Sequence, residues 1–397
     1  MRNACLALLL VPICSPGQWT QLPDFPGSAR DDAAAFAIGT DVYVGTGMEV
    51  GWTLTNDWYH YDGSSMQWST VASLPATPRQ YCSAFVLDDP NDNFGYLFGG
   101  LDANGPLNEL WRYDPGSDSW TQMASLPGEA RYAAVAFRGG YIATGLLDGG
   151  SATNELWQYD PDTDSWQQLA SVPGTARHRA CGMGLNGLAI VGGADTAYHA
   201  LDDCWTYDRS TDTWSACASL PEGRYGAMCG LAAYSNLVLG GATDPSTIVD
   251  TGFEFDLTSW LPSGDLHPGG PRRGGVLVEA SGSGGPGTWD TYLGLGLSHA
   301  LERKADWYVA TGAFSIVEHC AAELVLHPNP GNTTFTLQLP EFLSRGQLLV
   351  QDLSGRTVMD APLSSTTVDA SDWPSGSYLI QVIAADDRRF RGRWVKM

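Results

Sequence analysis

The chain repeats itself about every 46 to 52 residues. Four of its units contain the same text, W-x-x-x-A-S-[LV]-P, and an arginine follows each proline. A fixed period of this length indicates a repeat fold, in which each unit is one supersecondary structure. The tryptophans that mark the period are Trp19, Trp68, Trp120, Trp166, Trp214 and Trp260.

Each period predicts four short strands. A small-residue strand follows the arginine, a turn signal such as Gly139-Gly140 reverses it, and an apolar strand such as Tyr96–Phe98 usually ends in a glycine pair. A third strand such as Asn108–Asp114 ends in Tyr-Asp, and the tryptophan opens the fourth. Four antiparallel strands per period of this length are typical of a propeller blade.

The sixth unit is degenerate, with a Gly/Ser-rich insertion at residues 281–287, and it lacks a fourth strand of its own. The chain begins with an unpaired fourth-strand fragment, Gln18–Leu22. We therefore expect the N-terminal strand to complete the last blade, which removes the exposed edges of an open sheet. The prediction is an all-β, six-bladed propeller over residues 18–312.

The P-x-x-x-R, glycine-pair and Y-D-x-x-x-x-x-W elements resemble kelch repeats over Trp19 to Gly312. The first unit departs from the pattern, with Gly45-Thr-Gly47 in place of the glycine pair. The resemblance implies a kelch β-propeller, a scaffold that serves both binding proteins and enzymes.

A second domain is expected over residues 323–397, after a linker at 313–322. The segments Leu324–Pro330, Val350–Arg356, Trp373–Val382 and Arg393–Lys396 resemble the type A sorting domain of the type IX secretion system of Bacteroidota. Alternating strands such as Thr334–Leu339 predict a small Ig-like β-sandwich. The alternative is a carbohydrate-binding or adhesive sandwich. The resemblance assigns the sorting motif to Pro328, Asn329, Pro330, Asp352, Gly355, Arg356, Gly376, Tyr378 and Lys396.

The first 17 residues have the features of a secretory signal peptide: Arg2, the apolar run Cys5–Ile13, and small residues at Ser15 and Gly17. No other run is long enough to predict a transmembrane segment. We expect a protein that is secreted or attached to the outer-membrane surface after signal-peptide cleavage. Its expected export partner is the type IX machinery, which would act through the C-terminal domain.

The formal net charge is −23, and residues 323–397 contribute almost none of it, because eight acids face seven Lys or Arg there. Such an acidic propeller argues against nucleic acid as a partner and against anionic membrane surfaces.

Cysteine positions predict one disulfide. If Asp208 pairs with Thr213 in the hairpin of the fourth unit, Cys204 faces Cys217, where sister units have apolar pairs such as Leu110 with Met123. We interpret Cys82, Cys181 and Cys229 as buried free thiols, and the pairing of Cys320 stays open.

The candidate ligand site lies where the six recurring arginines precede the innermost strands, around one mouth of the channel. Arginine with aromatic residues is the composition of binding hot spots, and guanidinium groups suit carboxylates. The alternative is that each arginine neutralises a third-strand acid of its own period, namely Asp57, Glu109, Glu155 or Asp203. The predicted site comprises Arg30, Arg79, Tyr81, Arg131, Tyr132, Arg177, His178, Arg224, Tyr225 and Arg272.

These features favour a binding module for a protein or carbohydrate ligand, with no cofactor and no metal. The alternative is a carbohydrate-active kelch enzyme, like sialic acid epimerase or galactose oxidase. The seven histidines show no clustered ligand spacing for a copper site. Asp160–Asp164 resembles a calcium loop, but it occupies the ordinary turn between third and fourth strands.

Overall fold

The computed structural model describes residues 19–87, 93–184, 188–232, 235–255, 259–263, 267–282, 289–311, 325–328, 331–338, 346–352, 357–363, 365–384 and 389–396. The chain divides into two compact units, one at residues 16–316 and the other containing residues 317–397. The expected signal peptide and linker lie outside the described residues.

The first unit contains six four-stranded antiparallel sheets among its described residues, one for each expected repeat. The sheets are named blades 1 to 6 in chain order. Blade 1 comprises β3 (Ala34–Ile38), β4 (Asp41–Gly45), β7 (Trp58–Asp62) and β8 (Gln67–Val71). Blade 2 comprises β9 (Ser83–Phe85), β10 (Gly95–Phe98), β11 (Leu110–Asp114) and β12 (Ser119–Met123), and blade 3 comprises β14 (Val135–Phe137), β15 (Tyr141–Ala143), β17 (Leu156–Asp160) and β18 (Ser165–Leu169).

Blades 4 to 6 follow in the same order. Blade 4 comprises β19 (Cys181–Gly184), β20 (Leu188–Val191), β21 (Cys204–Asp208) and β22 (Thr213–Cys217). Blade 5 comprises β23 (Met228–Ala232), β24 (Ser235–Leu239), β27 (Gly252–Phe255) and β28 (Trp260–Pro262). Blade 6 comprises β30 (Val276–Ser281), β31 (Trp289–Gly294), β33 (Trp307–Thr311) and β1 (Thr20–Leu22).

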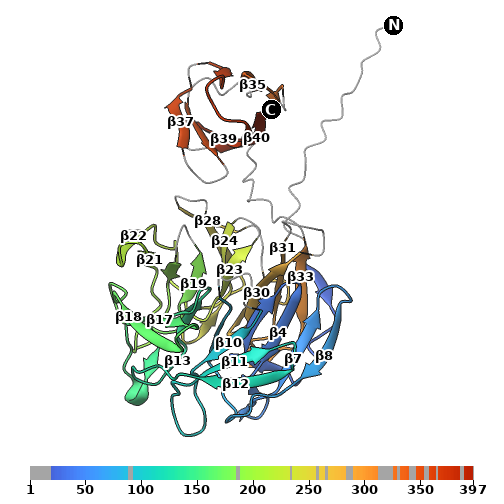
Figure 1. Cartoon of the computed structure of the whole chain (residues 1–397), viewed down its shortest axis with the longest axis vertical. Coiled ribbons are helices and arrows are strands. Elements are labelled where there is room, and N and C mark those ends of the chain that lie inside the picture. Colours follow the sequence, from blue (N-terminus) through green and yellow to red (C-terminus); the bar gives the residue numbers. More distant parts are fainter. Residues whose placement is uncertain are drawn as a thin grey trace. The chain divides into compact units, whose positions relative to one another are not determined.

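The N-terminal strand closes the propeller, as the sequence predicts. β1 pairs antiparallel with β33, with Thr20 opposite Val309 and Leu22 opposite Trp307. In Figure 1 the blue strands of blade 1 accordingly lie beside the orange strands of blade 6. The two ends of the repeat array are thereby joined within one sheet.

Short strands at one end of the channel lie in the second-to-third-strand loops and in the segments that precede the first strands of the blades. They are β2 (Arg30–Asp31), β5 (Met48–Glu49) and β6 (Thr53–Leu54); β13 (Arg131–Tyr132) and β16 (Leu146–Leu147); β25 (Ala242–Asp244) and β26 (Thr247–Ile248); and β29 (Arg272–Arg273) and β32 (Leu297–Ser298). One 3-10 turn, Asp148–Gly150, lies in the blade 3 loop.

The alanine of the repeated A-S-[LV]-P motif forms backbone hydrogen bonds with the next blade. Trp120 Nε1 of blade 2 donates to the Ala72 carbonyl of blade 1 at 2.9 Å, and the Ala72 amide donates to Asp118 at 2.7 Å. The Tyr113 hydroxyl donates to the same carboxylate at 2.8 Å. The backbone of Ala72, which follows the last strand of blade 1, is therefore hydrogen-bonded to blade 2 through both its amide and its carbonyl. The same contacts recur around Ala124 and Ala170.

The second unit contains two facing sheets. One comprises β34 (Val325–His327), β35 (Thr334–Gln338) and β38 (Thr367–Asp369); the other comprises β36 (Gly346–Asp352), β37 (Thr357–Pro362), β39 (Gly376–Ala384) and β40 (Arg389–Lys396). Phe335, Val350, Ile380 and Trp394 are fully buried in one shared core. Two antiparallel sheets around one core form the expected sandwich.

The predicted disulfide is present. Cys204 lies opposite Cys217 in the β21–β22 ladder, their Cα atoms are 5.0 Å apart, and their sulfurs are bonded. Cys82, Cys181 and Cys229 are free, as expected; Cys181 is buried, whereas Cys82 and Cys229 are half-buried. Burial raises the pKa of the Cys82 thiol to about 12, which suppresses the reactive thiolate.

Candidate ligand-binding site in the propeller channel

The six repeated arginines are buried, with at most 2% of each side chain exposed. Each of five pairs with the third-strand acid of its own blade, with N···O distances of 2.5 to 2.8 Å. The pairs are Arg30 with Asp57, Arg79 with Glu109, Arg131 with Glu155, Arg177 with Asp203 and Arg272 with Asp306.

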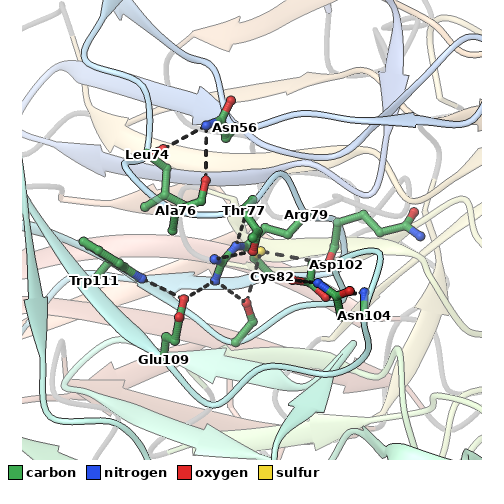
Figure 2. A network of polar contacts seen from close by, with 12 residues as sticks. Asn56, Leu74, Ala76, Thr77, Arg79, Cys82, Asp102, Asn104, Glu109 and Trp111 are labelled. Carbon is green, nitrogen blue, oxygen red and sulfur yellow. Dashed lines mark hydrogen bonds and ion pairs between the residues drawn. The ribbon is translucent and has the colours of Figure 1, made fainter.

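Figure 2 shows this network in blade 2. Arg79 Nε donates to the Thr77 carbonyl at 2.9 Å and Nη1 contacts Glu109 at 2.8 Å, while Trp111 Nε1 donates to the same carboxylate at 3.0 Å. The guanidinium therefore ties the loop before the innermost strand to the start of the third strand. Because these groups are buried and paired, we assign the arginines to the architecture and not to ligand contact.

Blade 5 is the exception, because Thr251 occupies the position of the acid. Arg224 donates to the Thr251 carbonyl at 2.7 Å, and Nη2 pairs at 3.0 Å with Glu222, a side chain that is 54% exposed. The Phe253 ring lies 4.4 Å from the guanidinium carbon. Burial lowers the pKa of Arg224, because Glu222 compensates the charge only in part.

The residues that line the channel stand two positions after the arginines. Their backbones form a closed ring in which each amide donates to the carbonyl of the preceding blade at 2.7 to 3.1 Å. All six have φ between +51° and +61°, the left-handed region that favours glycine. The ring residues are Asp32, Tyr81, Ala133, Arg179, Gly226 and Gly274.

Three of the ring side chains interact with one another. Arg179 Nη2 donates to the Tyr81 hydroxyl at 2.7 Å, and its guanidinium carbon lies 4.6 Å from the centre of the Tyr81 ring. The Tyr81 hydroxyl is also hydrogen-bonded to Asp32. These three side chains line a cavity of about 130 Å³ together with small residues such as Ala133 and Gly226.

The electrostatics of this trio are unusual. Burial, followed by the neighbouring Asp31 carboxylate, raises the pKa of Asp32 from 3.8 to about 7, although Arg179 and the Tyr81 hydrogen bond oppose the rise. Asp32 is partly exposed and lines the cavity. Burial and Asp32 raise the pKa of Tyr81 well above its ordinary value, so its hydroxyl remains protonated. The site thus combines a fixed cation, a fixed hydroxyl and a carboxyl group that titrates near neutrality.

The other predicted site residues lie at different depths. Tyr132 is half-buried, with its ring 5.8 Å from that of Tyr81. His178 and Tyr225 are buried, and the Tyr198 ring lies 5.0 Å from His178 and 5.9 Å from Tyr225. Burial, and then Arg179, lower the pKa of His178 to about 4, so its imidazole is neutral at pH 7.

Asp32 and Arg179 are not among the ten residues of the predicted site, whereas Tyr81 is. The available signal was the variation at the second position after each arginine, where three units have Ala or Gly and three have Asp, Tyr or Arg. Recurrence points to the arginines, whereas the cavity is lined by ring residues that differ from one repeat to the next.

The sequence predicts neither a metal site nor a transmembrane segment. Among the described residues, no group of three or more His, Cys, Asp or Glu side chains could hold a metal ion. The Asp160 carboxylate instead accepts hydrogen bonds from the Asp162 amide and the Thr163 hydroxyl within its turn. Within the part of the chain that the structure describes, no helix has the length and hydropathy to cross a membrane.

Three described residues of the expected sorting motif hold the second unit together. Lys396 Nζ donates to the carbonyls of Ala370, Ser371 and Trp373 at 2.5 to 2.8 Å. The Tyr378 hydroxyl donates to the Pro374 carbonyl at 2.5 Å. Gly376 begins β39 with φ of +157°.

The remaining members of the motif are only partly described. Pro328 accepts a hydrogen bond from Trp394 Nε1 at 2.7 Å, and Asp352 ends β36. Asn329, Pro330, Gly355 and Arg356 lie outside the described residues.

Two family descriptions match the chain. Residues 13–174 match the KLHDC2/KLHL20/DRC7 Kelch-repeats domain, and residues 325–395 match the secretion system C-terminal sorting domain. The protein therefore combines a Kelch-repeat β-propeller with a C-terminal sorting domain, the signal of the type IX secretion system. This signal points to secretion or the cell surface.

Individual relatives cover parts of the propeller. Human (Homo sapiens) Kelch-like protein 35 is 36% identical over 121 residues, which are 30% of this chain and 19% of the relative. N-acetylneuraminate epimerase of Shigella sonnei is 27% identical over 155 residues, 36% of this chain and 39% of that enzyme. The matches thus span well under half of either relative.

A solved structure, described as the structure of YjhT, shares the fold. It superposes with a TM-score of 0.61 at 17% sequence identity and covers 74% of this chain and 98% of its own. At this identity the similarity supports the propeller fold alone.

Proposed function

We propose that the protein is an exported binding module whose ligand, a protein segment or a carbohydrate, enters the channel cavity beside Asp32, Tyr81 and Arg179. The observation that carries the proposal is the asymmetry of the backbone ring. Its left-handed positions favour glycine, yet three of them bear large polar side chains that meet in one cavity. Backbone strain of this kind clusters at ligand sites.

Unpaired polar atoms of Arg179 and of two nearby residues support a polar ligand. Arg179 Nε is buried and has no hydrogen-bond partner among the described residues, and Arg179 lines the cavity. The same is true of Tyr225 Oη and His178 Nδ1, whose residues directly precede the cavity-lining Gly226 and Arg179 but do not line the cavity themselves. Such groups are costly to leave unsatisfied, so water or a ligand is expected to occupy this region. Arg179 and the neighbouring Arg273 favour a ligand with an anionic or strongly hydrogen-bonding group.

The location of this activity follows from the sorting domain. We propose that a signal peptide at residues 1–17 is cleaved, and that the type IX machinery then delivers the propeller to the medium or the outer-membrane surface. No cofactor is required for binding. Kelch domains serve as interaction modules, which agrees with this proposal.

The test is an array of glycans and peptides probed with the exported protein and with Arg179→Gln. This substitution keeps a hydrogen-bonding side chain but removes the charge that faces the cavity. We expect saturable binding to a restricted ligand set and at least a tenfold weaker affinity for Arg179→Gln. Lys304→Gln, which removes a partly exposed cation outside the cavity, is the control. Equal binding by wild type and Arg179→Gln would exclude the cavity as the site.

A second candidate is a carbohydrate-active enzyme. The observation that favours it is the pKa of Asp32 near 7, because a carboxyl group that titrates at the working pH can donate and accept protons. The similarity to N-acetylneuraminate epimerase agrees with this alternative. Proton NMR of sialic acid anomers is the test: faster interconversion with wild type and not with Asp32→Asn supports the enzyme, and no acceleration excludes this reaction.

A further inference from the structure

Two neighbouring loops expose large apolar side chains at the same end of the propeller as the candidate site. Val50 and Trp52 belong to the blade 1 loop and are 69% and 73% exposed, while Leu301 of the blade 6 loop is 65% exposed. Three of the five large exposed apolar side chains of the described residues thus lie here. We call Val50, Trp52 and Leu301 the apolar ridge.

The two loops are fastened together. The Arg30 amide of blade 1 donates to the Lys304 carbonyl of blade 6 at 3.2 Å. The guanidinium carbon of Arg303 lies 4.8 Å from the centre of the Trp52 ring, and Arg303 Nε contacts Asp31 at 2.5 Å. One face of the indole is thereby supported, yet most of the side chain remains in solvent. The support also lowers the conformational entropy that Trp52 would lose on binding.

Trp52 and Leu301 both have an unfavourable backbone conformation. Trp52 has φ of +63° and Leu301 has φ of +59°, and each amide closes its turn on the residue three positions earlier. Tyr198 of blade 4 has the same turn and φ of +63°, but its ring packs towards Arg179. The turn can therefore direct a side chain inward, and in blades 1 and 6 the apolar side chain is exposed instead.

We infer that the apolar ridge docks a protein partner through a segment with aliphatic or aromatic side chains flanked by Lys or Arg. Exposed Trp52 beside Arg303 matches the composition of binding hot spots. Clustered exposed apolar groups such as Val50 and Leu301 mark interaction sites. Val50 and Leu301 offer no side-chain hydrogen bond, which a sugar's hydroxyl groups would require. The propeller's share of the net charge, about −22 of −23, favours a basic partner.

Val50, Trp52 and Leu301 do not line the cavity, so the two proposals can fail separately. The probes are two sets of immobilised 12-residue peptides with the same Leu, Ile and Phe content, one flanked by Lys and the other by Glu, together with neutral glycans. They are incubated with the full exported protein, with Trp52→Ala and with Leu301→Ser. Met66→Ala is the matched control, because Met66 is 54% exposed on the β7–β8 hairpin of blade 1. Arg179→Gln reports on the cavity.

The expected result is saturable binding to the Lys-flanked set that weakens at least tenfold in both ridge variants, is unchanged in Met66→Ala and Arg179→Gln, and decreases with salt. Trp52 and Leu301 are mainly in solvent, so circular dichroism of the variants is expected to match wild type. The inference is overturned by absence of saturable peptide binding, by preference for the Glu-flanked set, by binding that both ridge variants retain, or by Trp52-dependent binding of glycans alone.

Discussion

Glu155→Gln tests the architectural role of the repeated ion pairs. Arg131 is fully buried, and its Nη2 is paired with Glu155 at 2.5 Å. Glutamine retains the size of the side chain and an oxygen that can accept from Arg131 and Trp157, so the substitution isolates the loss of charge. Removal of the partner of a fully buried charge costs about 3 to 5 kcal/mol.

The expected cost at this site is smaller, because the Glu155 side chain is 31% exposed and water screens part of the charge. We expect the free energy of unfolding to fall by about 2 kcal/mol. Glu222→Gln in blade 5 is the comparison. Glu222 is 54% exposed and Arg224 keeps its contacts with the backbone and Phe253, so a loss below about 1 kcal/mol is expected.

The assay is guanidinium denaturation at pH 7, followed by tryptophan fluorescence, since thirteen of the fifteen tryptophans precede residue 312. The effect of Glu155→Gln should vanish in acid. Burial opposes the charge of Glu155, but hydrogen bonds from Arg131 and Trp157 outweigh it and lower its pKa below 4.5, so its stabilisation is lost as the pH falls through that lowered value. Equal effects of the two substitutions at pH 7 would contradict a stabilising role of the Arg131–Glu155 ion pair.

Three further predictions concern other parts of the chain. Asp32→Asn should stabilise the protein at pH 8 and not at pH 4. The pKa of Asp32 in the folded protein, about 7, exceeds the ordinary value of 3.8, so the wild type loses stability as the pH rises between these two values, by about 2 kcal/mol because water screens part of the charge. Denaturation measurements in which the two proteins differ equally at both pH values would contradict this prediction. Cys204→Ala with Cys217→Ala should cost about 3 kcal/mol, because the bond closes a loop with a sequence separation of 13, and an unchanged unfolding midpoint would be the contrary result. Lys396→Met should destabilise the sorting unit by about 2 kcal/mol, because three carbonyls lose their charged donor. Calorimetry of the full chain should show a lower transition temperature for the sorting unit and an unaltered transition for the propeller.

Strand order was predictable because each repeat forms one sheet whose two faces are buried against the neighbouring repeats. The tryptophan period gave the strands of each blade, and the missing strand of the sixth unit indicated β1 as its replacement. The Cys204–Cys217 bond was predictable for the same reason, since an antiparallel hairpin fixes which residues lie opposite each other.

The cavity was less predictable, because a backbone angle decides which side chains reach it. The arginines and the acids that could neutralise them are both visible in the sequence. The sequence does not show whether the arginines bind a ligand or pair with these acids. Positive φ at the second position after each arginine carries Asp32, Tyr81 and Arg179 to the channel. No local pattern indicates that angle at aspartate, tyrosine or arginine, because the closed ring of backbone hydrogen bonds imposes it.

A high-resolution crystal structure of the exported protein with the strongest ligand from the array decides whether the cavity beside Asp32, Tyr81 and Arg179 is the binding site. We expect ligand density within hydrogen-bonding distance of Arg179 and the Tyr81 hydroxyl. Density at another surface, with the Arg179–Tyr81–Asp32 contacts unchanged and only water in the cavity, would contradict it.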